Sequence, residues 1–422
     1  MSFSFNTALS GLNANSNALN VVGNNIANAN TIGFRSGQIT FMDVFANRYG
    51  ARLNGAGNSL GIGNGVRTGA VHTNFSQGAL NESSSPLHSA ISGNGFFVVQ
   101  NSDGTRGYTR AGDFSLNNQG VLVSTTGGQV QGYQAVNGTV APGSSLSNLK
   151  FPLGQIFPPK MTTEATFKFN LNSAMATDKT YSVTSNIYDS LGGEHKMEMK
   201  FTKQADGSFL MEATVDGHPA EVDADGAGPS LTPVSFTFDA DGQLLTPAET
   251  LQIIPDQTEL GLAELPSIDV NLYELDDAGD PIRSFATAYA AASSSDSTYQ
   301  DGYKPGNLSG AAIDEDGNVF GVYSNGQSQI IGQLALAVFD SNDGLAHAGS
   351  NMFSETPASG QPTIGAANTG TRGAIAGGYL EQSNVNITNE FVELIEAQRG
   401  FQANSRVITT ANQTFQDLLQ MV

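Results

Sequence analysis

The two ends of the chain carry an apolar residue at every seventh position. In the last 38 residues this repeat is unbroken, while the positions four residues further on are apolar only at the edges. The repeat consists of Ile387, Leu394, Phe401, Ile408, Phe415 and Val422, and the following positions are Phe391, Gln398, Ser405, Asn412 and Leu419. A heptad repeat of this length favours a left-handed coiled coil over a lone surface helix. We therefore predict a long helix over 385–422.

The first 30 residues show the same seven-residue apolar repeat. The repeat consists here of Phe5, Leu12, Leu19 and Ile26, with Leu9, Ser16 and Gly23 between them. Small residues at the intervening positions let a second helix approach closely. We expect residues 1–34 and 385–422 to form one terminal domain of paired, coiled-coil helices.

Two interpretations of these helices stay open. They can form a hairpin packed within one chain, or they can become ordered only when neighbouring subunits complete the contact, because a narrow apolar stripe stabilises a lone helix poorly. In the second case the subunit interface is predicted to consist of Phe5, Leu9, Leu12, Leu19, Ile26, Ile387, Phe391, Leu394, Phe401, Ile408, Phe415, Leu419 and Val422.

Between the ends the period changes from seven to two, which is typical of strands. Strands are predicted around 95–100, 108–116 and 330–339, and further ones at 181–188, 196–202 and 234–238. Gly-rich turns such as Asp206-Gly207 and Asp241-Gly242 connect them. No alternation of strands and helices occurs, which disfavours a doubly wound nucleotide-binding fold.

Charge and proline indicate nested domains. Residues 161–290 hold 22 of the 39 acidic residues and six basic ones, a net charge of −16, and no proline occurs in 1–85 or 363–422. We predict a mainly β, multidomain chain with discontinuous domains. Helices 1–34 and 385–422 pair, 35–71 is a Gly/Asn-rich connector, 72–150 with 291–384 is a β middle domain, and 151–290 is an inserted acidic β outer domain.

Composition excludes several classes of protein. The chain has 422 residues, no Cys and a formal net charge of −21. Without Cys there are no disulfides, thiolate metal sites or cysteine nucleophiles, and the acidic balance argues against binding of nucleic acid. No apolar run is long enough for membrane insertion, and none resembles a cleavable signal. The chain is therefore expected to be cytoplasmic, or to be exported with its N-terminus retained.

Some segments match motifs for catalysis or metal binding, but each lacks the flanking elements or the ligands that its motif requires. The segment 57–61 matches a nucleophile elbow around Ser59, but that motif needs a strand before it and a helix after it, and the Gly/Asn-rich stretch 50–69 predicts neither. The acidic turns near Gly226, Gly242 and Gly317 suggest calcium loops, but the twelfth positions are Thr232, Ala248 and Tyr323 rather than Glu. We interpret them as Asp-Gly turns and expect no catalytic residues, no metal and no cofactor.

The termini resemble those of the bacterial flagellar axial proteins, the rod and hook family. Residues 8–14 and 24–35 look like the family's N-terminal motif, 391–406 look like its C-terminal motif, and 93–97 and 108–114 are similar to its middle domain. The motif positions are Asn24, Asn25, Asn28, Gly33, Phe34, Gln398, Arg399, Gly400 and Asn404. Within the family, the chain's length and acidic insertion resemble those of the hook-type members.

The resemblance implies a structural polymer and no enzyme. Such subunits leave the cell through the flagellar type III export apparatus without a cleaved signal peptide. Outside the cell they polymerise into a curved, flexible tube that transmits torque from rod to filament. The implied partners are copies of the chain, the rod, the hook cap and the hook-filament junction proteins. The alternatives are the straight distal rod of the same family and a secreted β-rich enzyme acting on polysaccharide.

Overall fold

The computed structural model describes residues 2–44, 47–48, 61–141, 143–224, 228–248, 250–256, 266–275 and 281–420. The predicted positions Ser59, Gly226 and Val422 lie outside these residues. The chain divides into two compact units, and we describe each by itself. Unit 1 comprises Met1–Leu153, Gly310–Val322 and Ser328–Val422, and unit 2 comprises Gly154–Ser309 and Tyr323–Gln327.

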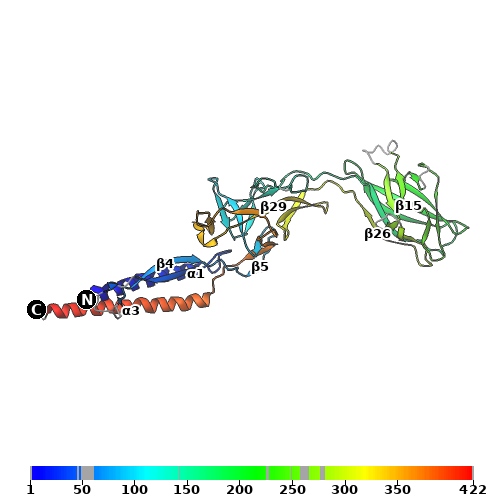
Figure 1. Ribbon diagram of the computed structural model, residues 1–422. Coiled ribbons are helices and arrows are strands. Elements are labelled where there is room, and N and C mark those ends of the chain that lie inside the picture. Colours follow the sequence, from blue (N-terminus) through cyan, green and yellow to red (C-terminus); the bar gives the residue numbers. More distant parts are fainter. Residues whose placement is uncertain are drawn as a thin grey trace, which may run out of the picture. The chain divides into compact units, whose positions relative to one another are not determined.

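Unit 1 contains two long helices, α1 (Ser2–Ala27) and α3 (Ile387–Gln420). They lie side by side, with the N and C ends of the chain at the same end of the pair (Figure 1). The side-chain amide of Asn386 begins α3 by accepting the backbone N–H groups of Thr388 and Asn389, as an N-cap residue does. The predicted pairing of helices from the two termini is therefore confirmed.

A hairpin of β1 (Gly37–Asp43) and β4 (Val66–Thr73) contacts α1. The side-chain amide of Asn17 donates to the Thr68 hydroxyl, and the Val66 N–H donates to the Ser10 hydroxyl. The short strands β2 (Asn47–Arg48) and β3 (Gly61–Ile62) pair with each other. The sequence predicted no strand in 50–69, and this was wrong for residues 61–62 and 66–69. Both strands of the hairpin are largely exposed, so burial leaves little trace in their sequence.

The remainder of unit 1 is a β module. In the described residues it has one large sheet and two short strand pairs. The sheet path is β27 (Leu308–Ile313), β28 (Asn318–Tyr323), β29 (Ser328–Val338), β11 (Gln129–Gln134), β7 (Phe96–Gln100), β8 (Arg106–Thr109), β31 (Met352–Ser354) and β30 (Ala346–Gly349). Beside it pair β9 (Phe114–Leu116), β10 (Leu122–Ser124), β12 (Ser147–Asn148) and β32 (Thr363–Ala366).

Two short strand pairs lie outside the large sheet, and one of them carries Glu381, which belongs to the site described below. They are β5 (Leu80–Glu82) with β34 (Tyr379–Glu381), and β6 (Ser89–Ser92) with β33 (Ala374–Gly377). A 3-10 turn, η1 (Asn342–Gly344), follows β29. Aromatic rings fill the core of the β module, where Phe75 packs on Phe96 and Phe353. The predicted strands near 95–100 and 330–339 are confirmed.

Unit 2 consists of two sheets that share one hydrophobic core. The first contains β18 (Glu221–Asp223), β21 (Leu251–Ile254), β22 (Ile268–Asn271), β13 (Glu164–Asn170), β25 (Ala286–Thr287) and β26 (Ser294–Gln300). The second contains β14 (Thr180–Tyr188), β15 (Glu194–Lys203), β16 (Phe209–Val215), β19 (Val234–Phe238), β20 (Leu244–Thr246) and β17 (His218–Pro219). A hairpin of β23 (Tyr273–Leu275) and β24 (Pro281–Ser284) completes the unit.

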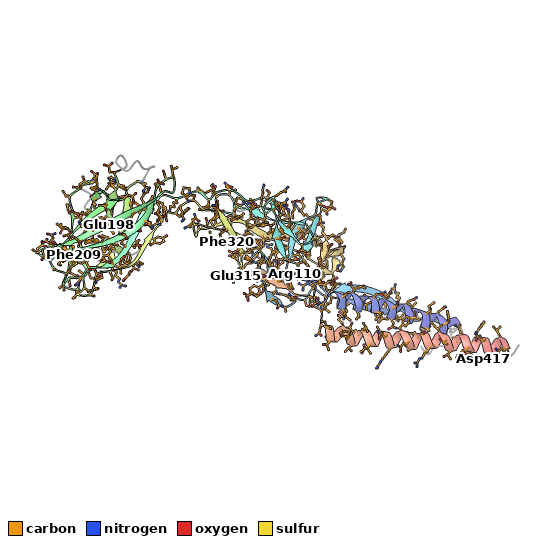
Figure 2. The ribbon with its side chains drawn as sticks, turned by 180° about the vertical axis from the view of Figure 1, so that it is seen from behind. Arg110, Glu198, Phe209, Glu315, Phe320 and Asp417 are labelled. Atoms are coloured by element: carbon orange, nitrogen blue, oxygen red, sulfur yellow. The ribbon has the colours of Figure 1, made fainter. Side chains whose placement is uncertain are left out.

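Alternating burial explains this sandwich. Every second residue is buried in β16, and in β15 from Met197 onward. Phe209, one of the largest buried side chains, lies in β16 (Figure 2). The strands predicted at 181–188, 196–202 and 234–238 are confirmed as β14, β15 and β19. Unit 2 extends past the predicted boundary at 290, because β26 pairs with β13. The predicted division into four domains stays a prediction.

The acidic turns hold no helix-flanked calcium loop where they are described. One carboxylate oxygen of Asp239 accepts the backbone N–H groups of Asp241 and Gln243, and Asp314 does the same for Asp316 and Asn318. These carboxylates therefore close Asx turns, as their interpretation as Asp-Gly turns predicted.

Candidate functional site: the terminal helices and the adjoining polar cluster

The two helices run antiparallel and approach closely at two glycines. A Cβ atom on Gly11 would lie 2.8 Å from Asn404 Nδ2, and one on Gly400 would lie 2.6 Å from Asn15 Oδ1. Further along, the Asn25 amide donates to the Glu390 carboxylate. Position numbers fall along α3 as they rise along α1, so the contact is antiparallel. Gly400 and Asn404 belong to the predicted family motif, and here they supply the close approach.

Small residues line the buried face of α1. Its buried positions are Ala8, Gly11, Ala14, Ala18, Val22 and Asn25. The predicted interface residues lie beside this line: Leu12, Leu19 and Ile26 are half-buried, whereas Phe5 and Leu9 are exposed. The contact within the chain is therefore offset by one residue from the apolar repeat, because the close approach of two backbones needs small side chains.

On α3 the predicted repeat is used in part. Leu394, Phe401 and Ile408 are half-buried. A second line of companions runs beside them, in which Glu390 and Ala397 are buried and Asn404 and Ala411 are half-buried. These companions follow the repeat by three residues rather than by the four that the sequence suggested. Of the fourth positions, Ser405 is half-buried and the others are exposed: Phe391, Gln398, Asn412 and Leu419.

Large apolar side chains remain exposed on α3. Ile387, Phe391, Val392 and Ile395 are 47–53% exposed. At helical spacing they lie on a face turned away from the α1 contact, which we call the α3 apolar face. All described side chains from Asn412 to Gln420 are exposed, and Phe415 and Leu419 among them reach 59% and 66%. Figure 2 shows Asp417 in this last part of α3, which we call the α3 end segment.

The asparagines of the N-terminal motif close α1 and attach it to its neighbours. The Asn28 amide donates to the Asn24 carbonyl, and the Asn28 side-chain oxygen accepts the Thr31 hydroxyl, which ends the helix. Asn25 donates to the Gly37 carbonyl and accepts the Gly37 N–H, at 2.8 and 2.9 Å. Asn25 therefore binds α1 to β1 as well as to Glu390.

Gly33 is required by the loop after α1. Its φ is +66°, and a Cβ there would lie 2.6 Å from the backbone nitrogen of Ala111. Its N–H donates to the Glu381 carbonyl at 2.7 Å. Phe34, the next motif residue, is half-buried, while Gln398 and Arg399 are exposed on α3.

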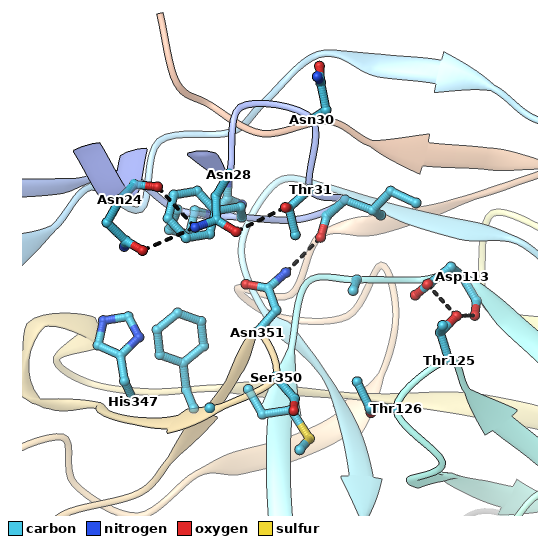
Figure 3. A pocket seen from close by; sticks show the side chains of 17 residues that line it. Asn24, Asn28, Asn30, Thr31, Asp113, Thr125, Thr126, His347, Ser350 and Asn351 are labelled. Carbon is cyan, nitrogen blue, oxygen red and sulfur yellow. Dashed lines mark hydrogen bonds between the residues drawn. The ribbon is translucent and has the colours of Figure 1, made fainter. Parts of the chain in front are cut away.

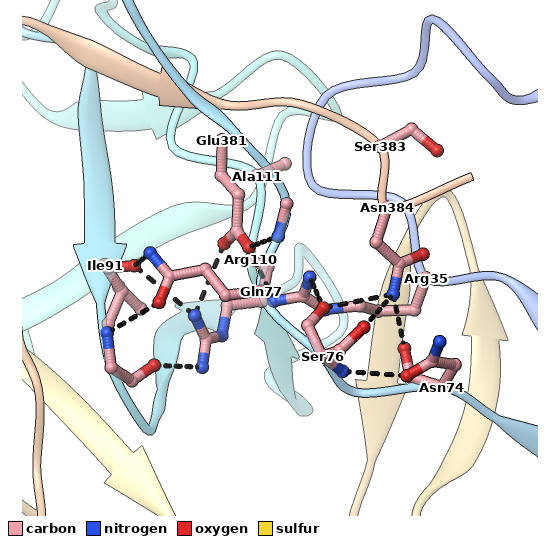
Figure 4. A network of polar contacts seen from close by, with 12 residues as sticks. Arg35, Asn74, Ser76, Gln77, Ile91, Arg110, Ala111, Glu381, Ser383 and Asn384 are labelled. Carbon is pink, nitrogen blue, oxygen red and sulfur yellow. Dashed lines mark hydrogen bonds and ion pairs between the residues drawn. The ribbon is translucent and has the colours of Figure 1, made fainter. Parts of the chain in front are cut away.

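A buried cluster of charges lies beside this loop (Figure 4). The Glu381 carboxylate is fully buried and pairs with Arg35 at 2.8 Å and with Arg110 at 3.3 Å. It also accepts the Gly78 N–H at 2.8 Å. Burial lowers the pKa of the Arg110 guanidinium to about 10, although Glu381 acts in the opposite direction. The carboxylate is thus shared by segments that lie far apart in the chain.

A pocket of about 600 Å³ opens between the end of α1 and the β module (Figure 3). One wall is the turn between β30 and β31, where Ser350 and Asn351 both have positive φ, 51° and 59°. The Asn351 amide donates to the Ile32 carbonyl at 2.6 Å. Asn351 therefore attaches the loop after α1 to the large sheet.

Sequence reasoning missed Glu381 and its partner Arg110. Arg110 and Glu381 are separated by 271 positions, so no local pattern connects them. The one available signal was Arg35, the first charged residue of the chain. Arg35 follows 34 uncharged residues, so a buried acidic partner could have been predicted for it. The sequence does not indicate which acidic residue that partner is.

No helix in the described residues is both long enough and apolar enough to cross a membrane. Within the same residues, no three His, Asp or Glu side chains gather as metal ligands would.

Four family descriptions match successive parts of the chain. They are "Flagella basal body rod protein" over 5–35, "Flagellar hook protein FlgE/F/G D1 domain" over 90–189, "Flagellar basal body protein FlaE D2 domain" over 158–303 and "Flagellar basal body rod FlgEFG protein C-terminal" over 376–421. The second and third descriptions therefore cover the strands on either side of the boundary between the units.

Curated relatives match from end to end. The flagellar hook protein FlgE of Escherichia coli K12 is 33% identical over 99% of both chains, and that of Treponema pallidum is 32% identical over 98% of both. A crystal structure of Helicobacter pylori flagellar hook protein FlgE2 aligns with a TM-score of 0.47 at 15% identity, over 72% of this chain and 100% of that one. On the full-length identity to the two curated relatives, this chain belongs to the flagellar hook protein family.

Proposed function

We propose that the chain is a structural subunit that polymerises with copies of itself into the flagellar hook, the curved and flexible joint that carries torque from rod to filament. The observation that carries the proposal is the α3 apolar face. Four large apolar side chains remain about half exposed after α1 and α3 have paired, and contiguous exposed apolar surface marks a site of association. The α3 end segment offers Phe415 and Leu419 in addition.

The composition of the ends supports contact between identical copies. Residues 1–34 contain no charged side chain, so copies of α1 can pack together without burying repeated like charges. On this proposal the helix pair of the first interpretation leaves an apolar face for neighbouring copies. The second interpretation, in which the helices become ordered only with neighbouring subunits, stays a prediction. The predicted interface residues Phe5, Leu9, Ile387, Phe391, Phe415 and Leu419 are exposed and suit this role.

The remaining partners follow from the same role. The hook joins the rod at one end and the hook-filament junction at the other, and its subunits assemble under a cap outside the cell. Export through the type III apparatus suits a chain without Cys and with proline-free ends, because no disulfide hinders an unfolded chain. The straight distal rod stays the alternative that the assembly experiment must separate, and no observation favours an enzyme.

The test is assembly of three purified chains, followed by electron microscopy and sedimentation. The full chain should form curved tubes, and a chain lacking 1–30 and 385–422 should stay monomeric. The third chain carries Phe391→Glu in the α3 apolar face. Burial of a Phe side chain is worth about 1.5–3 kcal/mol, so this variant should raise the critical concentration by about ten- to a hundredfold.

Leu191→Glu is the matched control, because Leu191 is a 76% exposed apolar residue of unit 2. It should assemble as the unmodified chain does. Straight tubes from the full chain would assign it to the rod. Equal assembly of the Phe391→Glu and Leu191→Glu chains would contradict the role of the α3 apolar face.

The acidic insertion is proposed to set the curvature. Bending requires contacts between subunits to lengthen on one side of the tube and shorten on the other, and polar, hydrated surfaces tolerate such sliding better than packed apolar ones. A chain without unit 2 should therefore still polymerise, but into tubes of altered curvature. Tubes of unchanged curvature would contradict this part of the proposal.

A further inference from the structure

Two turns of unit 2 lie at the same end of its second sheet. One is the turn between β14 and β15, residues 189–193, and the other follows β16 at Asp216. The first turn also contacts the stretches by which the chain enters and leaves unit 2, because a Cβ on Gly192 would lie 2.8 Å from Pro159 and 2.5 Å from Pro305. The two turns are close enough for one side chain to join them.

That side chain is His195, on β15. Its Nδ1 lies 2.8 Å from Asp216 Oδ2 and its Nε2 lies 3.4 Å from Asp189 Oδ2. Gly193 leaves room for this second oxygen, since a Cβ there would lie 2.8 Å from it. A carboxylate oxygen only accepts hydrogen bonds, so both ring nitrogens have to donate, and only the charged imidazolium carries an N–H on each. A neutral ring, which is 14% exposed here, would turn a bare lone pair toward one of the carboxylates.

Each carboxylate uses its other oxygen to hold backbone. Asp189 Oδ1 accepts the N–H groups of Leu191 and Gly193, at 2.9 and 2.7 Å, and Asp216 Oδ1 accepts the Lys196 N–H at 2.8 Å. Burial would raise the pKa of both carboxyls, but these N–H groups and the histidine lower it, and the net direction is down. The charge on the ring is therefore coupled, through the two carboxylates, to backbone N–H groups of the turns.

The elements around the ring bring further charged or titratable groups. Among the described residues these are Tyr188 at the end of β14, Glu194 and Lys196 on β15, and His218 on β17. His218 also helps to lower the pKa of Asp216. Histidine is the side chain that ordinarily changes its charge between about pH 5 and 8, so His218 is the group that a test must separate from His195.

We propose that His195 is a pH-sensitive link between the two turns, which joins both as the imidazolium and releases the turn 189–193 when the ring loses a proton. The longer contact, from Nε2 to Asp189, is the one that opens, because the shorter one keeps the remaining proton on Nδ1. The link is lost as the pH rises and the ring becomes neutral. It is also lost in acid, because carboxyls with a lowered pKa contribute above the ordinary pKa of an aspartate and cease to do so as the pH falls below it. The proposal concerns unit 2 alone and depends neither on polymerisation nor on the terminal helices.

The test follows the ring and the turn in the same sample of the full chain by NMR. The chain has five His, so selective labelling of histidine nitrogen gives few ring signals, and the His195→Gln variant assigns one set of them. The Leu191 amide reports the turn through its hydrogen exchange, expressed relative to an unstructured chain. Between about pH 6 and 8 its protection should fall by about tenfold, the factor for one ordinary hydrogen bond, along the same curve as the loss of the ring proton. Protection that stays constant while the His195 ring titrates would overturn the proposal.

Two variants separate the histidines. His195→Gln does not titrate in this range, so the fall in Leu191 protection should disappear. His218→Gln is the matched control, which removes the neighbouring histidine and should keep the fall. A fall that persists in the His195 variant, or disappears only in the His218 variant, would overturn the proposal. If the His195 variant does not fold, the agreement of the two curves in the unmodified chain, together with the His218 variant, decides.

Discussion

Gly11 and Gly400 occupy equivalent places in the helix pair. Each lies under an asparagine of the other helix, Asn404 over Gly11 and Asn15 over Gly400. Each asparagine also donates to the carbonyl of the glycine four residues earlier on its own helix, Asn15 to Gly11 at 2.7 Å and Asn404 to Gly400 at 3.0 Å. The contact thus has an approximate two-fold relation, although the two helices come from opposite ends of the chain.

Gly11→Ala should weaken the helix pair. Alanine favours a helix by up to about 1 kcal/mol over glycine, but its Cβ would displace the Asn404 amide, and overpacking costs about 1–3 kcal/mol. The amide cannot turn away without losing its bond to Gly400. We therefore expect a net loss of up to about 2 kcal/mol, measured as thermal unfolding of the helical circular dichroism signal.

Gly23→Ala, on the same helix, should change the stability in the opposite direction. Gly23 is exposed, and a Cβ there would meet nothing within 4 Å, so this variant should gain up to about 1 kcal/mol. If both alanine variants stabilise the helices, the close approach at Gly11 does not hold in solution.

Glu381→Gln should destabilise unit 1 strongly. The carboxylate is fully buried between Arg35 and Arg110, and removal of its charge leaves two guanidinium groups without a counter-charge. Breaking a buried pair costs about 3–5 kcal/mol, which should lower the Tm by roughly 10 °C. Calorimetry measures the change. Glu82→Gln, an exposed carboxylate on the partner strand, should leave Tm nearly unchanged, and equal effects would mean that the cluster is solvated.

Stability of the helix pair should fall as the pH rises above the ordinary range of a glutamate. Burial raises the pKa of Glu390, while its hydrogen bond from Asn25 acts against this and nearby Glu393 adds to it. The folded chain therefore holds a proton that the unfolded chain has released, between the ordinary pKa and the raised one. In that window the free energy of unfolding decreases with pH.

Glu390→Gln should remove this slope and stabilise the pair at neutral pH, because the Gln oxygen can still accept from Asn25. Urea unfolding followed by helical circular dichroism at several pH values measures it. Glu396→Gln, on an exposed position of α3, should keep the slope. A slope that survives in the Glu390 variant would assign it to another group.

The elements that the sequence predicted are those in which burial recurs at a regular spacing along the chain. Strands β14 and β15 bury alternate residues along most of their length, and the helices carry an apolar period. The β1–β4 hairpin was not predicted, because polar side chains such as Asn17 make contacts between it and α1. The face of α1 that contacts α3 was not predicted, because small residues such as Ala8 and Ala18 let the helices approach closely but add little to an apolar pattern.

The polar cluster could not be predicted for a different reason. Arg35, Arg110 and Glu381 come from three segments, and each is an ordinary surface residue type by itself. Their burial follows from the way β34 and the loop after α1 meet, which is a property of the folded chain. The family resemblance singled out Gly33, whose N–H donates to the Glu381 carbonyl, without assigning it a contact.

Unit 2 should lose stability in acid through Asp301. Desolvation would raise the pKa of this carboxyl, but the Glu164 N–H, the Lys160 ammonium and the Thr163 N–H and hydroxyl all bind the charged form, and the net result is a strongly lowered pKa. The Lys160 nitrogen lies 2.8 Å away. A lowered folded pKa means that the unfolded chain binds the proton first, so stability is fully present above the ordinary pKa of an aspartate and is lost as the pH falls below it.

Asp301→Asn should therefore lower the stability of unit 2 at neutral pH and flatten its acid dependence. An amide can keep one acceptor but not the charge, and hydrogen bonds to a charged group are worth about 1.5–3 kcal/mol. Lys160→Met is the informative companion, because Lys160 is half exposed and an exposed ion pair contributes about 0–1 kcal/mol. Its acid dependence should persist, carried by the two backbone N–H groups. If Lys160→Met flattens the curve as fully as Asp301→Asn, the ion pair rather than the backbone holds the carboxylate ionised.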